Sequence, residues 1–173
     1  GFCGGLRPQK NPLFLLEVFE RYHAINPDSA LILVGEGILR DDIERRIADG
    51  ELDGCVRLLG QRTDIAELYQ AMDAFVLPSV AEGLGIVYIE AQCAGLPCLG
   101  SAAVVPESAR VCELMSFERL ENGPEAWAER LDNMISHAAE RRDRSAEVKT
   151  AGYEMSDVAA QLQKFYMRNG KRA

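Results

Sequence analysis

The chain of 173 residues has no apolar run of about 18 residues, so we expect no membrane-spanning helix in it. Basic residues are also few, with 19 Lys and Arg against 27 Asp and Glu, which gives a net charge of −8. Phosphate contacts in nucleic-acid complexes need a basic face, which an acidic chain does not offer. We therefore expect no nucleic acid among the partners of this chain.

The five cysteines contain no Cys-x-x-Cys pair, and their number is odd. This argues against a zinc ribbon and against a framework of disulfides. Cys55 and Cys98 lie in apolar, strand-like runs, where we expect small buried side chains in a reducing cytosol. Residues 1–5 lack the basic start and long apolar core of a signal peptide and resemble the end of a strand that starts abruptly. The expected location is therefore cytoplasmic.

Apolar runs alternate with amphipathic stretches along the first hundred residues. Strand-like runs are expected at residues 30–34, 55–59, 73–77 and 96–99, and helices at 11–25, 39–47, 64–70 and 85–94. Asp64 is the expected N-cap of the third helix. Continuous apolar strands joined by helices are typical of a parallel sheet buried on both faces. We therefore expect an α/β fold, a Rossmann-like parallel sheet flanked by helices, with ligands bound at the carboxyl ends of its strands.

Residues 122–173 differ in character and are expected to form a helical tail. Asn122 is a good helix start, with Pro124 early in the helix and Glu125 placed to close a capping box. Residues 140–149 are mostly charged and should form a solvated link or helix face. The expected apolar stripes are Trp127, Leu131 and Met134 in the first tail helix, and Val158, Leu162, Phe165 and Tyr166 in the last.

The segment from residue 78 to 92 carries the most chemical information. Gly83 and Gly85 lie where a strand ends and a helix begins, and free N–H groups at a helix start form a seat for phosphate. Glu82 and Glu90 flank this seat. Because a carboxylate repels phosphate, their expected partners are sugar hydroxyls, which an ionised carboxylate accepts well. Phosphate with hydroxyls on both sides is the outline of a nucleotide sugar.

Glu82 and Glu90, with seven residues between them, match the Glu-x7-Glu motif of family 4 retaining glycosyltransferases. The chain resembles the carboxyl-terminal, donor-binding half of such an enzyme with the GT-B fold, over nearly its whole length. Supporting motifs in the expected order are Gly5–Asn11, Val34–Gly37, Leu59–Asp64 and Val76–Ser79. The tail, with Trp127 and Ala151–Tyr153, resembles the capsular or exopolysaccharide-synthesis branch.

The resemblance implies a set of donor-binding residues: Arg7, Lys10, Gln61, Arg62, Glu82, Gly83, Leu84, Gly85 and Glu90. Lys10 would bind the diphosphate, Glu82 the transferred sugar and Glu90 the ribose hydroxyls. The backbone at 83–85 would hold phosphate and sugar, and the loop at 60–63 would line the base. Lys10 and Glu82 are the expected catalytic residues. No metal and no other cofactor is expected. In this family retention is explained by front-face attack, which needs stabilisation of the leaving phosphate rather than a protein nucleophile.

Two departures from the family pattern stand out. Gly5 occupies the position of an arginine, and Arg7 is the candidate replacement, although a shift of two residues in a turn should direct its side chain elsewhere. A missing charge-assisted bond costs about 1.5–3 kcal/mol. The amino-terminal half, which supplies the acceptor site and a catalytic histidine in the family, is absent from this sequence. His23 and His137 lie in helical stretches, where we expect surface or packing roles.

The whole enzyme is expected to transfer a hexose from a nucleotide diphosphate sugar, with UDP favoured, to a glycan or lipid-linked acceptor in surface polysaccharide synthesis. The lone chain should bind donor without useful transfer, because catalysis needs the acceptor held in line. Alternatives are a non-catalytic nucleotide-sugar-binding module and a GT-B-type nucleotide-sugar isomerase.

Two further sequence features carry weaker predictions. Gly35-Glu-Gly37 lacks the third glycine of a dinucleotide fingerprint, since Arg40 stands there, so a nicotinamide cofactor is disfavoured. The basic end of the chain is either simply solvated or weakly attracted to an anionic inner membrane surface, and it comprises Lys164, Arg168, Lys171 and Arg172.

Overall fold

A computed structural model describes residues 1–169 of the chain. Within them, two parallel three-stranded sheets form, with strand orders β1-β2-β3 and β4-β5-β6. The strands are β1 (Phe2–Cys3), β2 (Leu31–Val34), β3 (Val56–Gly60), β4 (Phe75–Leu77), β5 (Cys98–Ser101) and β6 (Met115–Glu118).

Backbone hydrogen bonds of Gly1 join the two sheets. Its amino group donates to Ala74 O at 2.7 Å, and the N–H of Val76 donates to Gly1 O at 2.9 Å. These bonds place β1 beside β4, so the strands follow one another in the order 3-2-1-4-5-6. This is a doubly wound arrangement in which the chain reverses direction across the sheet between β1 and β4. The expected Rossmann-like α/β fold is confirmed.

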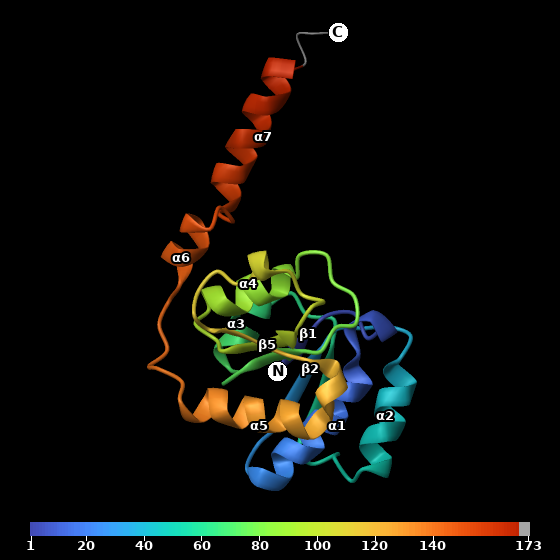
Figure 1. The fold of residues 1–173 in the computed structure, drawn as a ribbon. Helices are drawn as coiled ribbons and strands as arrows, with labels where there is room; N and C mark the ends of the chain where they lie inside the picture. Colours follow the sequence, from blue (N-terminus) through green and yellow to red (C-terminus); the bar gives the residue numbers. More distant parts are fainter. Residues whose placement is uncertain (170–173) are drawn as a thin grey trace.

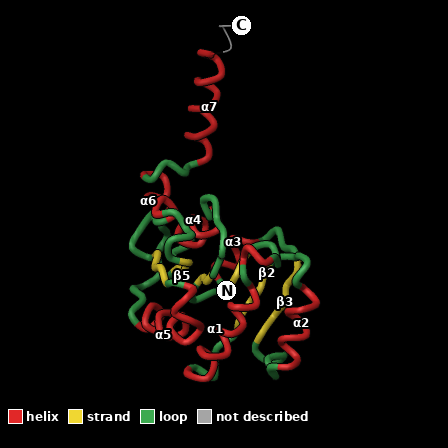
Figure 2. Tube along the Cα trace, turned by 45° about the vertical axis from the view of Figure 1, so that its right-hand side comes forward, coloured by secondary structure: helices red, strands yellow, loops and turns green. Residues whose placement is uncertain are grey.

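Helices cover both faces of this sheet (Figures 1 and 2). On one side lie α1 (Pro12–Ile25), α2 (Arg40–Asp49) and α5 (Gly123–Ser136), with α5 packed along α1. On the other side lie α3 (Ile65–Gln70) and α4 (Ile86–Cys93). Because both faces are covered, the strands read as continuous apolar runs, and Phe2, Leu33, Phe75, Leu77 and Leu99 are fully buried.

The cysteines are packing residues in this fold. Cys98 is fully buried in β5, Cys55 is half-buried, and all five thiols are free. Burial raises the pKa of the Cys98 thiol well above its usual value, because the thiolate would lose its hydration there. The sequence expectation of small buried side chains therefore holds for Cys98 and only partly for Cys55.

Asn122 and Asp64 are the N-cap residues of α5 and α3, as expected, but neither side chain caps its helix and the expected capping box does not form. Asn122 makes no side-chain cap, because its amide donates to Glu118 Oε1 at 2.7 Å. Glu125 is ion-paired with Arg21 of α1 at 2.8 Å instead of closing a capping box. The side chain of Asp64 makes no bond to the N–H groups of α3, because its carboxylate is paired with Arg62. For Asn122, Glu125 and Asp64 alike, a charged or polar side chain nearby competes with the backbone N–H groups of the helix start as a hydrogen-bond partner.

The carboxyl-terminal segment leaves the body of the domain. Residues 140–149 include the start of α6 (Ser145–Thr150) as well as a link. Arg144, just before this helix, is buried and forms ion pairs with Glu113 at 2.6 Å and with Glu147 at 2.9 Å. The final helix forms as expected, α7 (Met155–Asn169), but it projects away from the sheet (Figure 1) and its apolar side chains Leu162 and Tyr166 are exposed.

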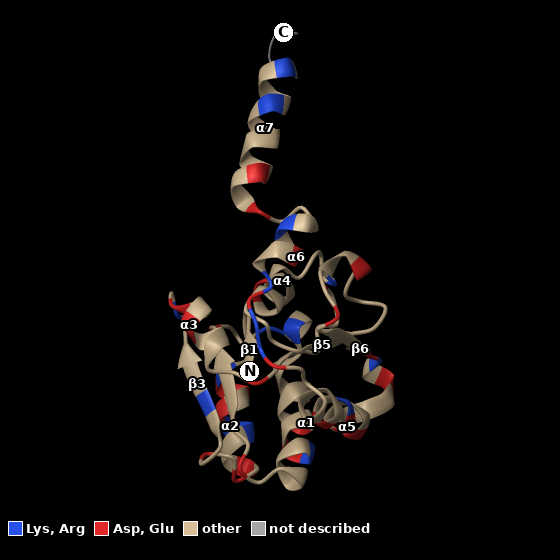
Figure 3. Cartoon of the chain, turned by 90° about the vertical axis from the view of Figure 1, so that its left-hand side faces the viewer, with Lys and Arg blue, Asp and Glu red and all other residues tan. Residues whose placement is uncertain are grey.

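Basic residues lie toward the end of α7 (Figure 3), where the sequence places Lys164 and Arg168. Lys171 and Arg172 lie outside the described residues. Between residues 1 and 169, none of the helices combines the length and the apolar composition that crossing a membrane requires.

Candidate functional site

Two loops meet at the carboxyl ends of the adjacent strands β1 and β4. The first loop, residues 4–10, follows β1, and the second, residues 78–85, follows β4. The N–H of Val80 in the second loop donates to Gln9 O in the first at 2.8 Å. Doubly wound sheets bind ligands at this kind of switch point, because loops on opposite faces leave a crevice between them.

Lys10 and Glu82 form an ion pair across the two loops. Lys10 Nζ lies 2.5 Å from Glu82 Oε2, although 72 residues separate the two in sequence. Ser79 Oγ donates to the same carboxylate oxygen at 3.3 Å. The side chains of Lys10 and Glu82 are 26% and 10% exposed, so the pair lies mostly out of bulk water and its attraction is weakly screened. The structure therefore brings a cation and a carboxylate together at the switch point, each neutralising the other.

The first loop is supported by the loop that follows β2. A Cβ added to Gly35, whose φ is +137°, would lie 1.9 Å from Gly4 O, so only glycine permits this backbone-on-backbone packing. The N–H of Leu6 donates to Glu36 O at 2.9 Å. This support fixes the chain immediately before the turn that carries Lys10.

Gly83 and Gly85 have different surroundings at the start of α4. Gly85 precedes α4 with φ +75°, and a Cβ there would lie 2.6 Å from the Tyr88 ring, so the fold itself requires glycine. A Cβ on Gly83 would meet nothing within 4 Å, so Gly83 borders open space. The first N–H groups of α4, on Ile86 and Val87, have no partners within the helix, and the helix dipole makes this end positive. The open space beside Gly83 is thus suited to an anion.

Glu90 lies one turn into α4 and is exposed. Its Oε2 accepts a hydrogen bond from the hydroxyl of Tyr69, in α3, at 3.1 Å. Tyr69 is 3% exposed. In the sequence Tyr69 reads only as an apolar-face residue of a short helix, since nothing in the pattern says which helix its hydroxyl meets.

The remaining candidate residues lie at the rim of the site. Gln61 and Arg62 are exposed in the loop after β3, and Arg62 Nε donates to Asp64 Oδ1 at 2.8 Å. Arg7 is exposed, yet its Cδ and Nε lie 3.6 Å from where a Cβ of Gly5 would be. The side chain of Arg7 thus packs against Gly5, and its replacement of an arginine at position 5 stays a prediction.

A second carboxylate–guanidinium pair lies next to the loop after β3. Arg40 donates to Glu36 Oε1 at 2.6 Å, and that oxygen lies 2.9 Å from where a Cβ of Gly60 would be. Sequence reasoning did not single out this pair, although its residues follow β2 at the same edge of the sheet as the site loops.

Both histidines make local hydrogen bonds outside these loops. His23 Nδ1, in the last turn of α1, lies 2.9 Å from Ser29 Oγ, and His137 Nδ1, just after α5, lies 2.9 Å from Asn133 O. These contacts agree with the packing and surface roles expected from the sequence.

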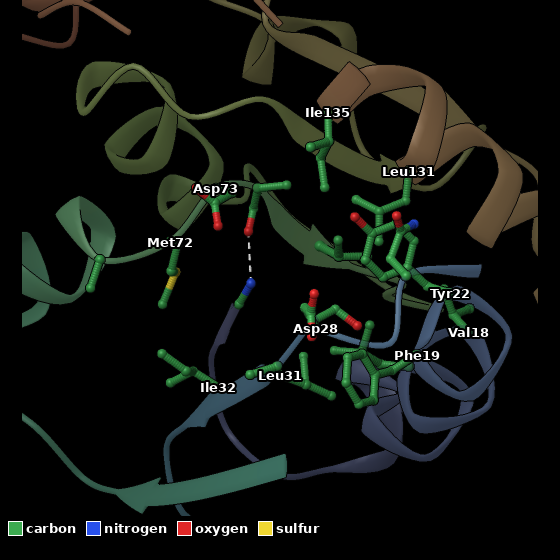
Figure 4. A pocket seen from close by; sticks show the side chains of 18 residues that line it. Val18, Phe19, Tyr22, Asp28, Leu31, Ile32, Met72, Asp73, Leu131 and Ile135 are labelled. Atoms are coloured by element: carbon green, nitrogen blue, oxygen red, sulfur yellow. Dashed lines mark hydrogen bonds between the residues drawn. The ribbon is translucent and has the colours of Figure 1, made fainter. Parts of the chain in front are cut away.

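A cavity of about 420 Å³ lies at the amino ends of the strands, opposite the site loops, between α1, α5 and the starts of β2 and β4 (Figure 4). Its lining is largely apolar and includes Val18, Phe19, Tyr22, Leu131 and Ile135. Because the cavity adjoins the amino ends of the strands, it is separate from the site formed by Lys10 and Glu82.

Residues 1–137 match the model of the Glycosyl transferases group 1 family. The chain is 43% identical over 101 residues to UDP-Gal:alpha-D-GlcNAc-diphosphoundecaprenol alpha-1,3-galactosyltransferase of Escherichia coli, a match covering 57% of this chain and 26% of that enzyme. It is 33% identical over 94 residues to the Vi polysaccharide biosynthesis protein VipC/TviE of Salmonella typhi, covering 54% of this chain and 16% of that protein. The chain thus spans a minor part of the length of these relatives.

One solved structure of similar extent is the C-terminal domain of a group 1 family glycosyl transferase, LpcC, from Francisella tularensis. It superposes with a TM-score of 0.66 and 22% identity, over 94% of this chain and 84% of that one. The fold, the family match over residues 1–137 and the expected motif at Glu82 and Glu90 agree, and the chain belongs to the Glycosyl transferases group 1 family, with the fold of its carboxyl-terminal domain.

Proposed function

We propose that this chain binds a nucleotide diphosphate sugar, with UDP as the nucleotide, in the crevice between residues 4–10 and 78–85. The observation that carries the proposal is the meeting of Lys10 and Glu82 beside the open, glycine-bordered start of α4. A cation and a helix amino end suit a diphosphate, and the adjacent carboxylate suits the hydroxyls of the sugar. The name of the Escherichia coli relative supports a UDP-linked donor.

In the whole protein, we propose transfer of a hexose to a glycan or lipid-linked acceptor in surface polysaccharide synthesis. The two relatives support this, since one name specifies a diphosphoundecaprenol acceptor and the other polysaccharide biosynthesis. Lys10 and the start of α4 would stabilise the charge that develops on the leaving diphosphate, and Glu82 would orient the sugar. Front-face attack, with the anomeric configuration retained, needs these groups and no protein nucleophile.

Calorimetric titration of UDP into the chain tests the proposal. We expect saturable binding, and we expect Glu90→Gln to weaken it about 10-fold, because a neutral amide replaces the carboxylate that accepts the ribose hydroxyls. Glu129→Gln, an exposed change on α5, is the matched control and should leave the affinity unchanged.

The outcomes of this titration separate the parts of the proposal. Absence of binding by both UDP and GDP would reject the function, and tighter binding of GDP would reject the assignment of the base. Unchanged UDP affinity in Glu90→Gln would reject the role of Glu90 alone.

Glu82→Gln should change UDP affinity in the opposite direction. In the free chain Glu82 engages Lys10, and UDP lacks the transferred sugar whose hydroxyls would give the carboxylate another partner. Removing the charge of Glu82 frees Lys10 for the diphosphate, so we expect UDP to bind about 3- to 5-fold more tightly. The same titration measures this, and weaker binding would show that Lys10 does not exchange partners.

A further inference from the structure

Tyr69 places a buried hydroxyl against the candidate site. It lies in α3, and its hydroxyl is 3.1 Å from Glu90 Oε2 and 3.4 Å from Val87 O, both in α4. The thiol of Cys3, in β1, lies beside this hydroxyl. Three elements that are distant in sequence therefore converge on one side-chain oxygen.

The contact leaves most of the Glu90 carboxylate available. A carboxylate offers about four acceptor positions on its two oxygens, and Tyr69 uses one of them on Oε2. The other oxygen can still accept two hydroxyls. Glu90 is exposed on the helix surface, so without this contact its side chain would exchange among rotamers and lose that freedom on binding.

The protonation state of Tyr69 suits a donor. Burial raises the pKa of Tyr69 far above its usual value, and the Cys3 and Glu90 side chains beside it raise the pKa further. The hydroxyl therefore stays neutral at physiological pH and keeps its proton for Glu90.

We propose that Tyr69 is a positioning residue that holds Glu90 toward the two hydroxyls of the donor ribose. This rests on the proposed function, in which Glu90 accepts those hydroxyls. The ring of Tyr69 has a separate packing role, edge-on against Phe75 at 5.8 Å, which phenylalanine would preserve.

Tyr69→Phe, titrated with UDP and with 2′,3′-dideoxyuridine 5′-diphosphate, tests the proposal. We expect UDP to bind about 3- to 10-fold more weakly, because the hydrogen bond that orients Glu90 is lost. The dideoxy analogue should bind as it does to the unaltered chain, since it has no ribose hydroxyls for Glu90 to accept. A purely structural role of Tyr69 would weaken both ligands equally.

Two further variants sharpen the result. Tyr88→Phe removes another buried hydroxyl, which donates to Leu77 O at 2.5 Å, and should keep the ratio of the two affinities unchanged. The double variant Tyr69→Phe, Glu90→Gln should bind UDP no more weakly than Glu90→Gln alone, because Tyr69 acts through Glu90.

The failures of the two proposals are distinguishable. If Glu90→Gln abolishes the preference for UDP over the dideoxy analogue and Tyr69→Phe retains it, the role of Tyr69 is overturned and the proposed function stands. If the unaltered chain binds neither ligand, the proposed function is overturned, and the inference on Tyr69 with it.

Discussion

Lys10→Met lowers the affinity of the chain for UDP about 100-fold in our expectation, the largest effect on binding of any single change at the site. Two causes add. The diphosphate loses its charge-assisted bond to Lys10, and Glu82, which pairs with Lys10 at 2.5 Å, is left as an uncompensated carboxylate beside it. Calorimetric titration measures the change.

The double variant Lys10→Met, Glu82→Gln separates these two causes. Removing the carboxylate removes the repulsion, so the double variant should recover part of the lost affinity. Both variants should have melting temperatures close to that of the unaltered chain, so that the differences in affinity are not due to unfolding. Equal UDP affinity in Lys10→Met and the unaltered chain would refute the assignment of the diphosphate to this loop.

Trp127→Ala should lower the free energy of unfolding by about 3–5 kcal/mol, the largest expected effect on stability. Trp127 is fully buried in α5, its ring meets Phe14 of α1 edge-on at 5.7 Å, and its indole N–H donates to Arg119 O at 3.0 Å. The change leaves a cavity between α5 and α1 and removes one of the two hydrogen bonds that Arg119 O accepts, the other coming from the N–H of Asn122. Since α1 begins two residues after Lys10, loosening this contact also loosens the support of the site.

Urea unfolding followed by far-ultraviolet circular dichroism measures this loss, because Trp127 is the only tryptophan and its fluorescence disappears with it. Trp127→Phe is the matched control. It keeps a ring against Phe14 and loses the indole N–H, so we expect a smaller loss of about 1–3 kcal/mol. A loss below about 1 kcal/mol in Trp127→Ala, which is ordinary for an exposed position, would contradict the packing role.

The elements that the sequence predicted well are those with a strong local pattern. The apolar runs of β2, β4 and β5 are largely buried, and the amphipathic helices repeat apolar residues at helical spacing. β6 was not predicted, because Ser116 and Glu118 alternate with its apolar residues and interrupt the run.

At the site, the motif indicated which residues to consider, and its positions relative to α4 were correct. Glu82 precedes the helix, Glu90 lies in its second turn and Gly85 has the positive φ that a glycine at this turn permits. The partners of these residues could not be read from the sequence, because Tyr69 and Lys10 approach from other elements.

By itself, the sequence determined the fold class, the family and the glycine-bordered helix start, since each depends on residues close together along the chain. Only the tertiary structure decided that Lys10 faces Glu82 and that the Tyr69 hydroxyl donates a hydrogen bond to Glu90. The physical reason is the placement of β1 beside β4, and of α3 beside α4, by hydrogen bonds and packing between segments separated by tens of residues. Such long-range pairings leave no periodic trace in the residues that make them.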